Sequence, residues 1–188
     1  LGPEQSGYLM SVGYDLYLKL LEEAVLEERG EEKRIETECA ADLTVNAHIP
    51  DRYVPSAEQR MDLYRRIAAL RTEEDADDLV DELIDRYGDP PRTVNNLISV
   101  ALLRAAAAGC GITEIAQKGE RLNFTLAQVD FAKVSSLCGG AAYRGRLLFS
   151  AGEKPYLALK VRKGEDALKL AARLVEEYRA TPLPSPAK

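Results

Sequence analysis

Four short stretches in the last third of the chain decide what kind of sheet it can form: TEIAQKG (113–119), RLNFTL (121–126), RGRLLFS (144–150) and PYLALKV (155–161). They are strand-like in length and composition, and turns that contain glycine separate them, which is typical of short strands. In an earlier segment, CAADLTVNAHI (39–49), apolar and polar residues alternate from Ala41 to Ile49. A period of two predicts a half-buried strand there as well.

Helical periodicity fills the intervals between these segments. A capping box at Ser56–Gln59 starts one helix, Thr72 caps a second, and Pro91 begins a third that is apolar on two sides. Shorter helices are expected near residues 130–137 and 165–178. The order of strand, helices, strands and helix predicts an α+β fold in which helices pack on a small, mostly antiparallel sheet.

The apolar stripes of the first two of these helices predict which side chains are buried. The first helix is expected to bury Met61, Tyr64, Ile67 and Ala68. The second is expected to bury Ala76, Leu79, Val80, Leu83, Ile84 and Tyr87. Gly88 suits the C-terminal end of the second helix, because glycine adopts the left-handed conformation that often follows a helix.

Charge is distributed unevenly along the 188 residues, of which 46% are hydrophobic and 30% are charged. The net charge is −7 over residues 1–50, −6 over residues 51–90 and +7 over residues 91–188. Nine acidic residues lie between Glu73 and Asp89, against Arg86 alone. A local field of this sign repels nucleic acid and attracts a basic protein surface.

The sequence contains none of the short motifs that carry catalysis. It has no phosphate-binding loop, no dinucleotide-binding fingerprint and no metalloprotease or serine-hydrolase motif. His48 is the only histidine, and it is expected to be a solvated residue on the polar face of the strand at 39–49. The three cysteines have no metal-ligand spacing. We therefore expect no catalytic residue, no metal site and no cofactor in this chain, and no membrane-spanning segment or signal peptide.

The acidic helix offers the clearest candidate for a functional surface. Glu82 and Asp85 lie three residues apart and project from one side of the helix, and Asp78 and Asp81 extend that side. Leu79, Leu83 and Ile84 are expected to point the other way. Such a face can pair with arginines on another protein domain, because guanidinium groups bind carboxylates in bidentate geometry. The alternative is a helix face that is merely solvated.

Two features of the sequence carry a resemblance to known proteins. The stretch LGPEQSG (1–7), followed by VGYDLYLKLLEEAV (12–25), resembles the end of the translocation motif shared by RecG helicases and the transcription-repair coupling factors (Mfd). Downstream, IPDRYVPSAEQRMDLYRRIA (49–68) and ELIDRYG (82–88) resemble the second family and not the first. The chain is therefore similar to the C-terminal part of a transcription-repair coupling factor, from Leu1 to about residue 180.

The resemblance implies a division of the chain and a context for it. Residues 1–35 would be the end of a translocase motor, comprising a coupling loop with Gln5 and Gly7, a hook helix and a linker. Residues 36–180 would form the C-terminal domain, and residues 181–188 a disordered tail. The ATP and Mg sites, and the contacts with RNA polymerase and double-stranded DNA, would lie in domains upstream. The whole protein would be a bacterial, cytoplasmic ATP-dependent translocase that displaces stalled RNA polymerase and recruits UvrA for nucleotide excision repair.

The resemblance also implies a regulatory role for the C-terminal domain. It would be autoinhibitory, because it would cover the UvrA-binding surface of a UvrB-like N-terminal module of the same protein, with Glu82, Asp85, Asp78 and Asp81 in the contact. The alternative is an accessory nucleic-acid-binding module of a RecG-like helicase. That alternative draws on the basic final part of the chain, which includes Arg144, Arg146, Lys154, Lys160, Arg162 and Lys163.

Overall fold

The computed structural model describes residues 38–181. The chain divides into two compact units, and each is described by itself. The helical unit comprises residues 44–105 of the described chain, and the sheet unit comprises residues 38–43 and 106–181. The expected hook helix and coupling loop, and the tail beyond Thr181, lie outside the described residues.

The helical unit contains α3 (Ala57–Ala68), α4 (Glu73–Tyr87) and α5 (Arg92–Gly109), whose last turn belongs to the sheet unit. Side-chain caps set two of the starts, as the sequence predicted. The hydroxyl of Ser56 accepts a hydrogen bond from the backbone N–H of Gln59 at 3.3 Å, and that of Thr72 accepts one from Asp75 at 3.1 Å. Gly88 ends α4 with φ of 84°, a conformation that residues with a side chain rarely adopt.

One apolar core holds the helical unit together. It includes Ile67 from α3, Leu79 and Leu83 from α4, and Val94 and Leu97 from α5, all of them at most 3% exposed. The expected apolar face of α3 was wrong at one position. Met61 is 37% exposed and Leu63 is buried instead, because the buried face of α3 is centred on Leu63 and Ile67, which are four residues apart.

The predicted strand at residues 39–49 is only partly formed. Hydrogen-bonded pairing is confined to β1 (Ala40–Asp42), and residues 43–50 are irregular. The alternation of burial nevertheless continues beyond the strand, since Leu43, Ala47 and Ile49 are buried. The period of two therefore predicted burial correctly. A strand also needs a hydrogen-bonded neighbour, however, and the pairing of β1 with β2 ends at Asp42.

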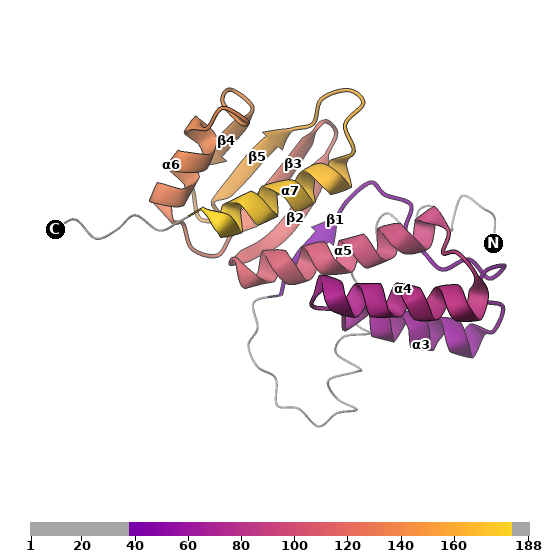
Figure 1. Cartoon of the computed structure of the whole chain (residues 1–188). Coiled ribbons are helices and arrows are strands. Elements are labelled where there is room, and N and C mark those ends of the chain that lie inside the picture. Colours follow the sequence, from indigo (N-terminus) through magenta and orange to yellow (C-terminus); the bar gives the residue numbers. More distant parts are fainter. Residues whose placement is uncertain (1–37, 182–188) are drawn as a thin grey trace. The chain divides into compact units, whose positions relative to one another are not determined.

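The sheet unit contains the other four predicted strands, namely β2 (Ile112–Lys118), β3 (Arg121–Leu126), β4 (Leu147–Ser150) and β5 (Tyr156–Lys160). The strand order is β1-β2-β3-β5-β4 (Figure 1). The pair β1–β2 is parallel and the other three pairs are antiparallel. Together with five helices among the described residues, this confirms the predicted α+β fold with a mostly antiparallel sheet.

The sheet unit also contains two helices, α6 (Phe131–Gly139) and α7 (Ala167–Ala180), which contact one another through Lys133 and Tyr178. The ring of Phe131 in α6 packs against that of Phe149 in β4, so both helices cover the face of the sheet to which Phe149 belongs. Asp130 and Asp166 cap them by accepting hydrogen bonds from backbone N–H groups at 3.1 Å. The covered face is formed by the alternate apolar residues of the strands, which are at most 2% exposed: Ile115, Leu122, Phe124, Leu126, Leu147, Leu157 and Leu159. The opposite face carries the intervening residues.

Candidate functional site

Helix α4 separates an apolar side from an acidic side. Ala76, Leu79 and Leu83 are buried in the core of the helical unit. At about 100° per residue, Asp78, Asp81 and Asp85 fall on the opposite side of the helix, and all three are exposed. These three aspartates are called the outer acidic face below. Within residues 38–181, no lysine, arginine or histidine lies within 4 Å of their carboxylates in an ion pair.

Glu82 differs from the three aspartates because its carboxylate is already engaged. Arg66 of α3 donates to both of its oxygens, with Nη1 at 3.0 Å from Oε1. Arg86, one turn further along α4, lies at 3.5 Å. The hydrogen bonds from Arg66 lower the pKa of Glu82, and Arg86 adds to the effect. The structure therefore places Glu82 at the boundary between α3 and α4, at the edge of the outer acidic face.

Arg86, the only cation in the acidic stretch, is held on the same side as Glu82. Besides its contact with Glu82, its guanidinium lies 5.1 Å from the centre of the Tyr87 ring. Tyr87 in turn packs against Tyr53 at 5.7 Å between ring centres and donates a hydrogen bond to Gln59 at 2.9 Å. These contacts keep the charge of Arg86 away from the outer acidic face, whose negative charge stays uncompensated.

Ile84 corrects one sequence-based expectation. It was predicted to point inward with Leu79 and Leu83, but it is 42% exposed. Ile84 lies about 100° around the helix from Leu83. The part of α4 that contacts the core is narrower than the apolar stripe in its sequence, so Ile84 falls outside it. An exposed isoleucine therefore borders Asp81 and Asp85. No local pattern in the sequence indicates this exposure, and none indicates the ion pair of Glu82 with Arg66, which lies 16 residues earlier.

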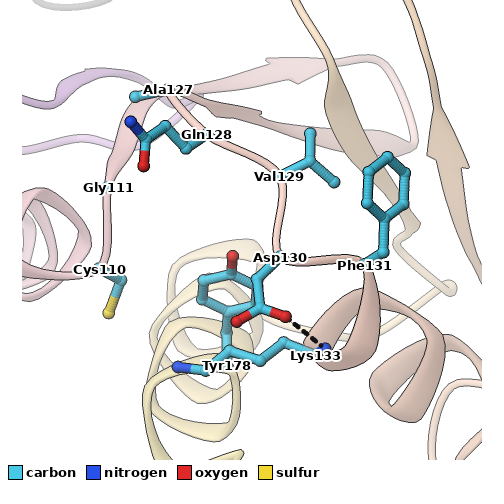
Figure 2. Close-up of a pocket in the computed structure, with 9 residues that line it drawn as sticks. All are labelled: Cys110, Gly111, Ala127, Gln128, Val129, Asp130, Phe131, Lys133 and Tyr178. Carbon is cyan, nitrogen blue, oxygen red and sulfur yellow. Dashed lines mark hydrogen bonds between the residues drawn. The ribbon is translucent and has the colours of Figure 1, made fainter. Parts of the chain in front are cut away.

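The sheet unit contains a pocket of about 810 Å³ that opens beside the start of α6 (Figure 2). Asp130 lines it, but its carboxylate is occupied as the cap of α6. Lys133 places its ammonium 5.4 Å from the centre of the Tyr178 ring. Burial raises the pKa of the Cys110 thiol, so that it is protonated at neutral pH and a poor nucleophile. These residues do not form a nucleophile paired with a base.

His48 also differs from its prediction. It is half-buried and not solvated, its backbone N–H donates to Thr93 at 3.2 Å, and its Nδ1 is buried without a hydrogen-bond partner among the described residues. Burial lowers the pKa of His48, and the nearby Arg52 lowers it further. The side chain is therefore neutral at pH 7.

Other kinds of site are not indicated in the part of the chain that the structure describes. No group of three or more histidine, cysteine, aspartate or glutamate side chains there is arranged to hold a metal ion. No helix among residues 38–181 is long and apolar enough to cross a membrane. Gln5 and Gly7, the predicted coupling residues, lie outside the described residues, so their role stays a prediction.

Comparisons with known proteins relate this chain to one family. A family model described as the TRCF domain matches residues 43–137. The transcription-repair-coupling factor of Staphylococcus haemolyticus is 37% identical over 128 residues, which cover 67% of this chain and 11% of that protein. That of Bacillus subtilis is 32% identical over 155 residues, covering 82% of this chain and 12% of that protein. The chain thus spans about a tenth of the length of these relatives.

A solved structure shares the fold. The crystal structure of the C-terminal domain of a transcription-repair coupling factor matches with a TM-score of 0.67 and 17% sequence identity, covering 78% of this chain and 94% of that one. At this identity the likeness supports the fold alone.

Proposed function

The chain belongs to the TRCF domain family, and from that premise we propose that it is an autoinhibitory domain whose acidic helix α4 docks on a basic surface of another module of the same protein. The partner would be a UvrB-like N-terminal module, and docking would cover the surface to which UvrA binds. The residues proposed for the contact are Asp78, Asp81, Glu82 and Asp85.

The observation that carries this proposal is the uncompensated charge of the outer acidic face. Asp78, Asp81 and Asp85 are exposed and lack ion-pair partners among residues 38–181. Carboxylates in this state can accept bidentate hydrogen bonds from arginines without first breaking an internal contact. The exposed Ile84 adds apolar area beside them. Glu82 would take part by sharing its carboxylate between Arg66 and an arginine of the partner.

The energetics of such a contact suit a switch. Exposed ion pairs contribute about 0.2–1 kcal/mol each, so a few of them hold a domain closed without making closure irreversible. UvrA binding or movement of a motor would then open the contact. In the proposed whole protein, ATP and Mg would act in a translocase motor upstream, which would move on double-stranded DNA and displace stalled RNA polymerase. Gln5 and Gly7 would belong to the coupling loop of that motor. That protein would work in the bacterial cytoplasm.

A binding measurement tests the proposal. The 188-residue chain is mixed with the UvrB-like module of a transcription-repair coupling factor, and binding is followed with and without UvrA. The double substitution Asp81→Ala and Asp85→Ala should weaken binding about five- to thirtyfold, which corresponds to roughly 1–2 kcal/mol. UvrA should compete with the chain for the module.

The matched control is Glu120→Ala with Glu153→Ala. It removes the same charge from exposed positions of the sheet unit, so it should leave binding unchanged. Equal weakening by the two double variants would show that only net charge matters. Simultaneous binding of UvrA and the chain to the module would also refute the proposal.

A further inference from the structure

The face of the sheet that α6 and α7 leave uncovered carries a row of three cations. Paired residues on neighbouring strands point to the same face, and Lys118 of β2 pairs with Arg121 of β3, which pairs with Lys160 of β5. Because Leu122 and Leu159, the next residues in register, belong to the buried face, the three cations belong to the opposite one. We call Lys118, Arg121 and Lys160 the basic row.

Both helices of the sheet unit lie on the other side of the sheet. The ring of Phe131, at the start of α6, packs at 6.1 Å against that of Phe149, whose strand position is in register with the buried Leu157. Lys133 of α6 contacts Tyr178 of α7, so the two helices share that side. Leu148, which occupies the row next to the basic row on the uncovered face, is 61% exposed.

The basic row lacks internal compensation. All three side chains are exposed, and no carboxylate among the described residues forms an ion pair with any of them. Like charges directly opposite one another on neighbouring strands destabilise a sheet. Three cations in register therefore oppose folding slightly, and an anionic partner would remove that cost.

We propose that the basic row binds the sugar-phosphate backbone of duplex DNA. Neighbouring strands lie about 4.7–4.9 Å apart, so the row presents positive charge at regular intervals along a line. That arrangement complements a regular linear polyanion. Arg162 and Lys163, both exposed just after β5, extend the positive charge beyond the end of the row.

The rest of the face favours contact with the backbone over reading of bases. The adjacent row consists of Asp42, Ala116, Asn123, Ala158 and Leu148, of which Ala116 is buried and Leu148 is 61% exposed. Tyr156 is half-buried and is the only aromatic residue of β2–β5 on this face, so a platform for stacking unpaired bases is not formed. Binding should therefore be independent of sequence and strongly dependent on salt.

The chain as a whole has a net charge of −6, which predicts weak binding. Its affinity should be measured by fluorescence anisotropy with a labelled DNA duplex from about 50 to 200 mM salt. If three phosphates are contacted, the logarithm of the association constant should fall with the logarithm of the salt concentration with a slope of about −2.7. The triple substitution Lys118→Ala, Arg121→Ala and Lys160→Ala should remove most of this slope, a reduction of up to about 2.7 in its magnitude, and should abolish most of the binding.

The matched control is Lys169→Ala, Arg173→Ala and Arg179→Ala, which removes the same charge from exposed positions on α7, over the opposite face. It should retain binding and most of the salt slope. A thermal melt provides a second readout, because the basic-row variant should be at least as stable as the parent once the repulsion is gone.

Several outcomes would overturn the proposal. One is equal loss in the two triple variants, which would indicate a general effect of net charge. Another is a basic-row variant that melts well below the parent, which would indicate a structural role. A third is tighter binding to polyglutamate or to a second copy of the chain than to the duplex, because the partner would then be an acidic protein surface.

Discussion

The ion pair between Arg66 and Glu82 allows a quantitative test of how α3 and α4 are joined. Replacing Glu82 with alanine removes both hydrogen bonds that Arg66 donates and the weaker contact with Arg86. Replacing Asp85, one turn away in the same helix, removes a carboxylate without an ion-pair partner among residues 38–181. The side chains removed in the two variants differ in size by only one methylene. The main difference is that Glu82→Ala loses an ion-pair partner and Asp85→Ala does not.

The expected cost follows from geometry and exposure. The side chains of Arg66 and Glu82 are 41% and 38% exposed, so water and salt screen their attraction. Exposed pairs contribute about 0.2–1 kcal/mol, and bidentate geometry places this pair toward the upper end. We expect Glu82→Ala to lower the free energy of unfolding by about 0.5–1 kcal/mol, and Asp85→Ala to change it by less than about 0.5 kcal/mol.

The assay is a double-mutant cycle of Arg66→Ala and Glu82→Ala, with unfolding by urea followed by circular dichroism. The coupling energy should be about 0.5–1 kcal/mol at low salt and should shrink in high salt. Because the pKa of Glu82 is lower in the folded state, this stabilisation is present above the pKa of an unfolded glutamate and is lost as the pH falls through the folded pKa. The coupling should accordingly vanish in acid.

Two results would refute this reasoning. One is a coupling energy indistinguishable from zero at low salt, which would mean that the observed geometry contributes nothing. The other is an equal coupling between Arg66 and Asp85, which would mean that Arg66 responds to the general field of α4 and not to one carboxylate.

Two further predictions concern Phe124 in the sheet unit and His48 in the helical unit. Phe124→Ala, at a fully buried position of the sheet unit, should lower the free energy of unfolding by about 3–5 kcal/mol. Thr125→Ala, on the uncovered face, should lower it far less, and equal urea midpoints for the two variants would contradict the assignment of faces. Because the pKa of His48 is lower in the folded state, the free energy of unfolding should fall as the pH drops below about 6.5. The melting temperature of the His48→Gln variant should therefore depend less on pH than that of the parent between about pH 8 and pH 5, and parallel curves for the two proteins would contradict this.

Local sequence determined the kinds of element and most of their limits. RLNFTL coincides with β3, and Ser56, Thr72 and Gly88 mark helix ends where the structure has them. These signals are readable because strand periodicity and helix capping depend on residues at most four positions apart. The α+β class followed from the order of such elements. The acidic side of α4 followed from the helical period alone.

Tertiary structure decided everything that depends on a distant partner. The strand at residues 39–49 stops at Asp42 because β2, its partner some 70 residues later, pairs with it only that far. Ile84 is exposed because the other helices cover a narrower stripe of α4 than its apolar residues mark out. Glu82 is set apart from its acidic neighbours because folding brings Arg66 beside it. The basic row exists only through the register of three strands, and periodicity within one strand carries no information about register between strands.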